Sequence, residues 1–259
     1  MKIDKIITEN INKVITEGYG SKILENEVRN KIPKIIKWMK YCSYDAMFLD
    51  DDMHHYISKE KIEIDINKVL GNSNAENIKT ILVKYIYLPK KVIESGAYGE
   101  SFYDVYEPVV ECYFGSNTTE NDIFDCIIHE LSHAVDSLIL NEKPNIIHHT
   151  HQKKQMVDYN LPQCIQDLLY ILWDTTEFNA WQTTYHRVGG DFNEFFETMM
   201  YNLEKAYEID DNNVWSSLRY YLISRGMEKF KTVQLSSIKK YFINTTFKKL
   251  KKFIKKIKL

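Results

Sequence analysis

The hydrophobic positions at the start of the chain recur every three or four residues, which is the spacing of one face of a helix. In residues 3–15 these positions are held by isoleucine and valine, and Gly18 and Gly20 end the pattern. A second stretch with helical spacing covers Leu24 to Met39 and contains Pro33. Because proline lacks the amide hydrogen of a helix interior, we predict two N-terminal helices, the second disturbed at the proline.

The spacing then changes to that of strands. The segment Lys61 to Val69 alternates isoleucine with polar residues, and Thr80 to Leu88 is an apolar run rich in β-formers. Val109 to Phe114 is likewise rich in apolar β-forming residues and is followed by glycine and serine. We predict three short strands here. The segment Gly96 to Glu107 is rich in glycine and tyrosine and is predicted as a loop.

A longer helical pattern follows in Asn121 to Leu140, which contains no proline or glycine. Its apolar stripe consists of Ile123, Ile127, Leu131, Ala134 and Leu138. Thr118 or Thr119 is the predicted N-cap, and Asp122 lies three residues after Thr119, as in a capping box. The stripe predicts a helix that is anchored in the core along one face.

The C-terminal half is almost wholly helical in pattern. The predicted helices are Asp174–Val188, Phe192–Tyr207, Val214–Ser224 and a last helix that runs to the C-terminus. Helices, then a small sheet, then more helices are typical of an α+β fold. We assign residues 1–237 to one domain and residues 238–259 to a separate basic helix.

Composition places the chain among globular proteins. Of its 259 residues, 44% are hydrophobic and 27% are charged, which is ample for a core. Four scattered cysteines without a C-x-x-C pair indicate reduced thiols rather than a disulfide framework. The charged N-terminus lacks the apolar segment of a secretory signal, and no apolar run approaches the length of a membrane span. We therefore expect a cytoplasmic protein.

Lysines concentrate at the C-terminus. Residues 239–258 contain nine lysines and no acidic residue, which leaves 25 basic against 36 acidic residues in the rest of the chain. An apolar stripe runs through the same segment at Ile243, Phe247, Leu250, Phe253, Ile254 and Ile257. Such a basic amphipathic helix binds an anionic membrane surface or docks its stripe on the acidic body. Nucleic acid is the least favoured partner, because few aromatic residues interleave the lysines.

The strongest chemical signal is the sequence H-E-x-x-H at His129, Glu130 and His133. Histidines four residues apart lie one turn apart on the same helix face, so both imidazoles can bind one metal ion. Glu130 points to the same side and is placed to take a proton from a metal-bound water. The motif indicates a zinc-dependent hydrolase. The alternative is a pair of ordinary helix histidines beside a glutamate.

A catalytic zinc usually has three protein ligands and an open position. Glu177 is the strongest candidate for the third ligand, because it lies in the first turn of a predicted helix that Asp174 caps. Aromatic residues flank it, and a carboxylate buried among them needs a partner such as a metal. The alternative is a first-turn glutamate that is stabilised by the helix N-terminus.

Other candidate ligands are weaker. Asp136 lies three residues after His133 on the same helix, so it either accepts a hydrogen bond from a ligand imidazole or lies at the surface. Two further groups of histidines and aspartates are predicted to be solvated loops without ligand spacing. These groups are His148, His149 and His151, and Asp50, Asp51, Asp52, His54 and His55.

This arrangement resembles the gluzincin branch of zinc metallopeptidases. Within it, His129-Glu-Leu-Ser-His-Ala-Val-Asp136 followed by Glu177-Phe-Asn-Ala resembles the catalytic domains of the anthrax lethal factor family. In that family H-E-F-G-H-A-V-D is followed by a helix of the E-F-F-A type, whose glutamate is the third ligand. The match covers two short stretches, and Glu177 lies 44 residues after His133, a long separation for the branch.

The resemblance implies a zincin-like fold, a Zn²⁺ cofactor and a peptide or protein substrate. It implies a catalytic tyrosine shortly before the third ligand, for which Tyr170 is the candidate; Tyr185 and His186 are its rivals after that ligand. It also implies that Val109 to Phe114 is the edge strand on which an extended peptide pairs. Residues 96–100 then border the cleft.

Together these patterns predict a zinc-dependent metallopeptidase. Glu130 is its expected base, Tyr170 and Tyr185 are further catalytic candidates, and His129, His133 and Glu177 are its expected metal ligands. The alternative is a catalytically silent binding protein with the zincin fold, or a toxin or phage effector that the basic tail recruits. An intact Glu130 favours the enzyme, because a pure metal-binding module has no need of a base.

Overall fold

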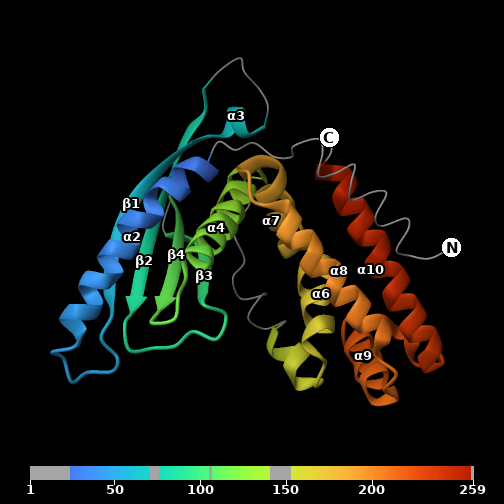
Figure 1. Cartoon of the computed structure of the whole chain (residues 1–259). Coiled ribbons are helices and arrows are strands. Elements are labelled where there is room, and N and C mark those ends of the chain that lie inside the picture. The colour runs from blue at the N-terminus through green and yellow to red at the C-terminus, as the bar shows by residue number, and fades with distance from the viewer. Residues whose placement is uncertain (1–23, 71–75, 105–106, 141–152, 258–259) are drawn as a thin grey trace. The chain divides into compact units, whose positions relative to one another are not determined.

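The computed structural model describes residues 24–70, 76–104, 107–140 and 153–257 and has an α+β architecture (Figure 1). A small, mixed, four-stranded sheet is combined with mostly helical structure, which confirms the predicted α+β class. The described chain divides into two compact units. One holds the sheet and residues 180–190, and the other holds helices from residues 153–179 and 191–257. The helix predicted for residues 3–15 lies outside the described residues.

The sheet has the strand order β1-β2-β4-β3. Its strands are β1 (Tyr56–Asp65), β2 (Ile78–Leu88), β3 (Ala97–Asp104) and β4 (Glu107–Gly115). β1 is antiparallel to β2, β2 is parallel to β4, and β3 is antiparallel to β4. The two edges of the sheet are therefore β1 and β3.

Two sequence predictions about the sheet were wrong. The segment predicted as a loop contains β3, and Val109 to Phe114, predicted as the edge strand, lies in β4 between β2 and β3. Both errors have one cause. The inward positions of β3 are Ala97, Gly99 and Ser101, which are too small to give an alternating hydrophobic signal.

The first predicted strand starts and ends earlier than its pattern indicates. β1 ends at Asp65, whose side chain accepts hydrogen bonds from the backbone amides of Asn67 and Lys68. This cap begins the short helix α3 (Ile66–Val69), so the apolar residues at 66 and 69 belong to a helical turn. The prediction extended the alternation across a helix cap.

Helix α2 (Glu25–Ala46) continues through Pro33 and passes its predicted end by seven residues. Its buried residues keep helical spacing on both sides of the proline. They are Val28, Ile32, Ile35, Met39, Cys42 and Ala46. Pro33 is exposed, so the carbonyl that loses its helical partner lies on the solvent side. Packing of the apolar face therefore outweighs the local cost of the proline.

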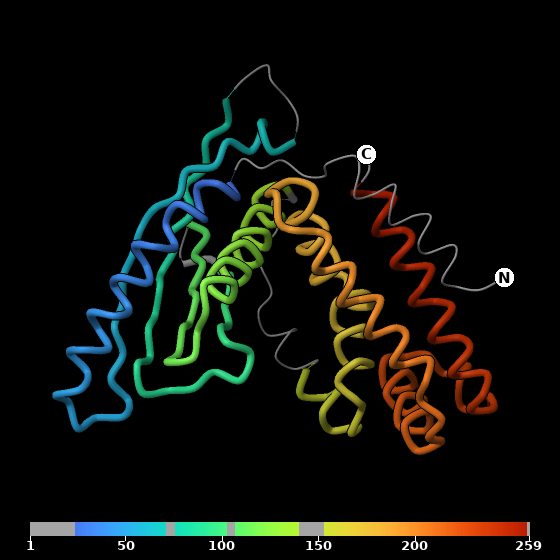
Figure 2. Tube along the Cα trace, in the orientation of Figure 1, coloured from blue at the N-terminus to red at the C-terminus, as the bar shows by residue number. Residues whose placement is uncertain are grey.

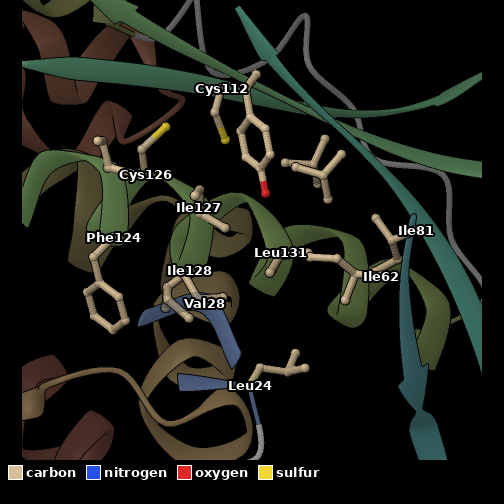
Figure 3. Close-up of a cluster of buried hydrophobic side chains, with 14 of the residues drawn as sticks. Leu24, Val28, Ile62, Ile81, Cys112, Phe124, Cys126, Ile127, Ile128 and Leu131 are labelled. Carbon is tan, nitrogen blue, oxygen red and sulfur yellow. The ribbon is translucent and has the colours of Figure 1, made fainter. Parts of the chain in front are cut away.

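The core of the sheet unit lies between the sheet, α2 and the motif helix α4 (Glu120–Leu140). α4 packs against β3 and β4, and α2 packs against α4. Figure 3 shows Ile127, Ile128 and Leu131 of α4 among side chains of α2 and the strands. These three are at most 1% exposed. Truncation of Leu131 to alanine is expected to cost about 2–5 kcal/mol, so the core fixes α4 firmly.

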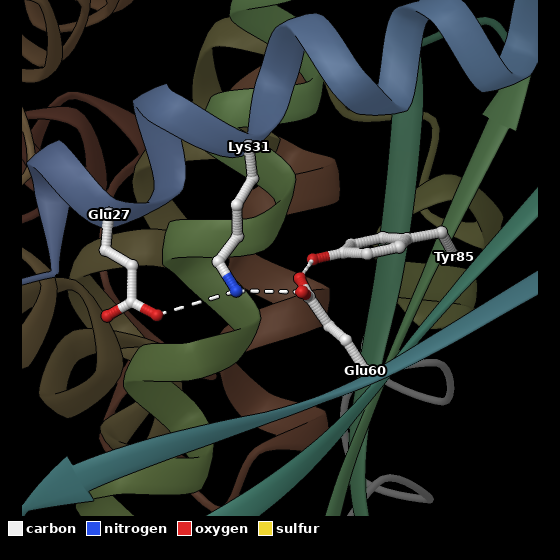
Figure 4. Close-up of polar contacts among 4 residues, drawn as sticks. All are labelled: Glu27, Lys31, Glu60 and Tyr85. Atoms are coloured by element: carbon white, nitrogen blue, oxygen red, sulfur yellow. Dashed lines mark hydrogen bonds and ion pairs between the residues drawn. The ribbon is translucent and has the colours of Figure 1, made fainter.

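A polar network ties α2 to the sheet (Figure 4). Lys31 Nζ of α2 lies 2.8 Å from Glu60 of β1 and 3.5 Å from Glu27, one turn back on α2. Tyr85 of β2 donates a hydrogen bond to the other oxygen of Glu60. Burial raises the pKa of the Tyr85 hydroxyl, so it stays protonated and can donate. The network fixes the register of α2 on the sheet.

The helical unit is built from α6 (Gln163–Trp173), α8 (Phe192–Glu208), α9 (Asn212–Ser224) and α10 (Leu235–Ile257). α6 packs on α8, and α10 packs on α6, α8 and α9 (Figure 2). The side chain of Asp191 caps α8 by accepting a hydrogen bond from the backbone amide of Asn193. The helices after the motif therefore lie close to their predicted positions.

The basic C-terminal helix buries its apolar stripe in the helical unit. The buried residues of α10 are Ile238, Phe242, Ile243, Thr246, Leu250, Phe253, Ile254 and Ile257. Six lysines of α10 are exposed: Lys240, Lys248, Lys251, Lys252, Lys255 and Lys256. The predicted boundary between residues 237 and 238 falls inside this helix. Among the described helices, none has the length and apolarity that a membrane crossing requires.

Candidate metal centre

The motif helix forms where the sequence predicts it and begins with the predicted capping box. The backbone amide of Thr119 donates to Asp122 Oδ2 at 2.8 Å, and the amide of Asp122 donates to Thr119 Oγ1 at 3.3 Å. These bonds satisfy amides that lack an intrahelical partner, so the start of α4 is fixed. The buried stripe of the helix then sets which side faces the sheet. This orientation in turn fixes the directions in which the motif side chains project.

His129 and His133 are half-buried and lie one turn apart on α4. Their Nε2 atoms are 3.1 Å apart. In a tetrahedral zinc site, two nitrogen ligands at 2.0–2.1 Å from the ion are separated by about 3.3 Å. The two imidazoles therefore fit a shared ion through Nε2 with almost no rearrangement.

Glu130 lies beside this pair and is only 7% exposed. Its side chain is turned toward the edge strand β3, where it lies against the backbone of Gly99. A carboxylate in such a water-poor position interacts more strongly with nearby charges than it would in water. The arrangement suits a group that accepts and releases a proton in a place shielded from bulk water.

The segment after α7 (Thr175–Thr183) is held against the motif helix. It is a π-helical turn, η1 (Thr184–Val188), which ends at Gly189 in the left-handed region with φ 95°. The hydroxyls of Thr184 and Ser132 are hydrogen-bonded at 2.5 Å, and both are buried. Because Ser132 lies between the motif residues on α4, this bond fixes η1 and the end of α7 beside the motif.

Two aromatic rings extend this contact to His129. The Trp181 ring lies 4.4 Å from the His129 ring, and Tyr185 stacks on Trp181 at 5.6 Å with an interplanar angle of 12°. Packing of this kind limits rotation of the imidazole. Sequence reasoning treated Trp181 only as a neighbour of Glu177, and no local pattern signals its contact with His129.

Glu177 is 1% exposed and is held at two points. Its backbone amide donates to Asp174 Oδ1 at 3.0 Å, which is the predicted cap of α7. Its Oε1 accepts a hydrogen bond from the Tyr170 hydroxyl at 2.7 Å. Tyr170, predicted as a catalytic candidate, therefore contacts the predicted third ligand directly.

Glu177 shares the helix α7 with Trp181. It lies four residues before Trp181, so both side chains share one face of the helix. Trp181 contacts His129, and Glu177 lies one turn before it. In the part of the chain that the structure describes, one potential ligand atom from each of His129, His133 and Glu177 lies within 4.8 Å of the other two. Two imidazoles and a carboxylate are a donor set of catalytic zinc sites.

The other predicted candidates that the structure describes are not part of this group. Asp136 is half-buried and accepts a long hydrogen bond from Thr183, with 3.4 Å between the oxygens. His55 is exposed and His54 packs its ring on Tyr56. The histidines at 148, 149 and 151 lie outside the described residues. His186, a rival catalytic candidate, follows Tyr185 in η1 and is half-buried.

Comparisons of the chain with protein-family models, with curated proteins and with solved structures found no match. The chemistry of the site is therefore inferred from its own residues.

Proposed function

We propose that the chain is a zinc-dependent metallopeptidase of the gluzincin type, with a zincin-like catalytic domain. The grouping of His129, His133 and Glu177 carries the proposal, because it brings together two ligands from a motif and one from a separate helix. The buried Glu130 beside the group supports a hydrolytic role. The small mixed sheet that packs on the motif helix supports the zincin-like architecture.

These three residues would hold the zinc, which would supply Lewis acidity and lower the pKa of a water to about 7. Glu130 accepts the proton of the attacking water and passes it to the leaving amine of the peptide. Its burial favours this exchange, because bulk water does not compete for the proton. The protein thus contributes a base at a fixed position next to the group that activates the water.

The two tyrosine candidates take different roles in this proposal. Tyr170 donates its hydroxyl hydrogen to Glu177, so we assign it to orienting the carboxylate ligand. Tyr185 packs on Trp181, which itself packs on His129. It is the candidate for stabilising the oxyanion of the transition state, with His186 as its rival.

The proposal is tested by separating zinc binding from hydrolysis. The purified protein should hold about one zinc per chain, and His133→Ala should abolish binding. Glu130→Gln should keep the zinc but lose hydrolysis, because an amide cannot accept the proton. Zinc is measured by elemental analysis, and hydrolysis by mass spectrometry on a proteome-derived peptide library.

Each result distinguishes the enzyme from its alternative. Zinc retained by His133→Ala would refute the site. Zinc bound by the native protein without cleavage of any library peptide would favour the silent binding protein. Equal cleavage by the native protein and Glu130→Gln would refute Glu130 as the base.

A further inference from the structure

Gly99 lies where the edge strand β3 meets the proposed base. A Cβ atom added to Gly99 would lie 2.3 Å from Cγ of Glu130, and 2.9 Å from its Cδ and Oε1. Real Cβ atoms essentially never approach another heavy atom closer than 3.0 Å. Glu130 therefore occupies the space that any larger residue at position 99 would fill.

The backbone conformation does not explain this glycine. Gly96, Gly189 and Gly226 have positive φ angles and need glycine for that reason, but Gly99 is not among them. Glycine inside a strand is unfavourable, because it loses more conformational freedom on folding and packs no side chain. Position 99 requires glycine because Glu130 lies so close that a side chain would not fit.

Neither partner of this contact can easily move away. Glu130 is 7% exposed and belongs to a helix whose buried face is fixed in the core. β3 is hydrogen-bonded to β4 along its length, with Gly99 opposite Cys112. β3 is also held at its start, where the hydroxyl of Thr118 donates to the carbonyl of Gly96. The backbone of β3 is therefore held in place where it contacts the Glu130 side chain.

We propose that Gly99 is a positioning residue for Glu130. The bare backbone of β3 sets the rotamer of Glu130 and the depth at which its carboxylate lies beside the two histidines. This inference rests on the proposed function, in which Glu130 is the base. It also assigns β3 a role in the active site beyond that of an ordinary sheet edge.

The first test is Gly99→Ala in the full chain. The added methyl group must push Glu130 out of its place, and a displacement of about 1 Å can reduce a rate by 100-fold. We expect one zinc per chain and an unchanged KM, with kcat reduced at least tenfold on the library peptide that the native protein cleaves best. Phe102→Leu is the matched control. It alters a residue on the other face of β3, outside the segment 96–100, and it should keep native kcat.

The second test does not depend on activity. It is a double-mutant cycle on the unfolding of the metal-free protein in urea. Gly99→Ala should lower the unfolding midpoint of the native sequence. It should lower the midpoint much less in a Glu130→Ala background, because that variant lacks Cγ, Cδ and Oε1, the three atoms that the methyl group meets.

The outcomes separate this inference from the function on which it rests. Equal midpoint shifts in both backgrounds would overturn the contact. The two mutations are coupled if Gly99→Ala shifts the midpoint much more in the native sequence than in the Glu130→Ala background. Such coupling together with native kcat in Gly99→Ala would overturn the positioning role alone. A coupled midpoint in a protein that cleaves no library peptide would overturn the proposed function, and with it the catalytic meaning of Gly99. Coupling together with a selective loss of kcat supports the proposal.

Discussion

Two hydrogen bonds fix the Glu177 side chain, and both come from residues within seven positions of it. Asp174 caps the amide of Glu177, and Tyr170 donates to its carboxylate. A buried carboxylate without partners would be costly, so the Tyr170 hydroxyl helps to make this position tolerable. In the proposed zinc site the same bond would orient the carboxylate before the metal binds and so raise the metal affinity.

Tyr170→Phe should therefore weaken zinc binding while it leaves the fold intact. Loss of a group that orients a ligand typically lowers metal affinity by about 10- to 100-fold. The measurement is a competition titration of the purified variant against a chelator of known affinity. Tyr201→Phe, an exposed tyrosine on α8, serves as the control and should keep native affinity. An unchanged affinity in Tyr170→Phe would show that the bond has no role in holding the ligand.

The residues of the site differ in how far the sequence reveals them. His129, Glu130 and His133 lie within one helical turn, so their spacing alone predicts that they share a face. Glu177 was predicted from its cap and its apolar neighbours, which are also local features. Gly99 and Trp181 reach His129 and Glu130 only because β3 and η1 pack on α4, and such long-range pairing leaves no spacing in the sequence.

At the scale of elements, the outer face of β3 carries an acidic pair. Glu100 lies directly opposite Glu111 across β3 and β4. Partial loss of hydration raises the pKa of Glu100, and the charge of Glu111 raises it further. Burial also acts to raise the pKa of Glu111, but hydrogen bonds from Lys84 and Tyr113 outweigh it and lower that pKa. The ionised form is thus stabilised at Glu111 and disfavoured at Glu100.

Glu100→Gln should therefore stabilise the protein at pH 7. Like charges directly opposite each other cost about 0.5 kcal/mol, a figure that solvent screening of this exposed residue keeps low. Because the folded pKa of Glu100 is raised, its penalty is present above that pKa and disappears below the unfolded pKa near 4.3. Urea unfolding at pH 7 and at pH 3.5 measures both predictions. Glu63→Gln is the control, since Glu63 faces Thr80. A gain that persists at pH 3.5 would contradict this account.

The elements that the sequence predicted well are those with large apolar residues at regular spacing. α4 and α8 bury broad faces, and their predicted bounds differ from the observed ones by one residue at most. β3 failed because its inward side chains are small, and α2 was cut short because the local effect of Pro33 was overestimated. For both β3 and α2 the local sequence preference was weak, and tertiary packing determined the secondary structure.

At the scale of the whole molecule, charge is divided unevenly along the chain. α10 contains no acidic residue, and the rest of the chain has a surplus of acids. Since the apolar stripe of α10 is buried, this helix offers lysines rather than an inserting face. Lys248, Lys251, Lys252 and Lys255 lie on one side of it, within about two helical turns. Such a row attracts phosphate-rich surfaces by charge alone.

We propose that this row draws the protein to anionic membranes. Each lysine near such a surface contributes about 1 kcal/mol, so replacing all four with glutamine should lower vesicle binding by more than tenfold. Binding is measured by sedimentation with phosphatidylserine vesicles at low salt, and added salt should weaken it. Substitution is sharper than removal of α10, because truncation would delete Phe242, Leu250 and Phe253 from the core.

The matched control removes the same number of positive charges from another part of the chain. Lys34, Lys37, Lys40 and Lys59 are exposed lysines of the sheet unit, and their replacement by glutamine also removes four positive charges. If the row on α10 is the binding surface, the control should sediment like the native protein while the α10 variant stays in solution. Equal losses in the two variants would mean that overall charge, not this helix, governs binding. Negligible sedimentation of the native protein would leave the lysines as the solvated face of a docked helix.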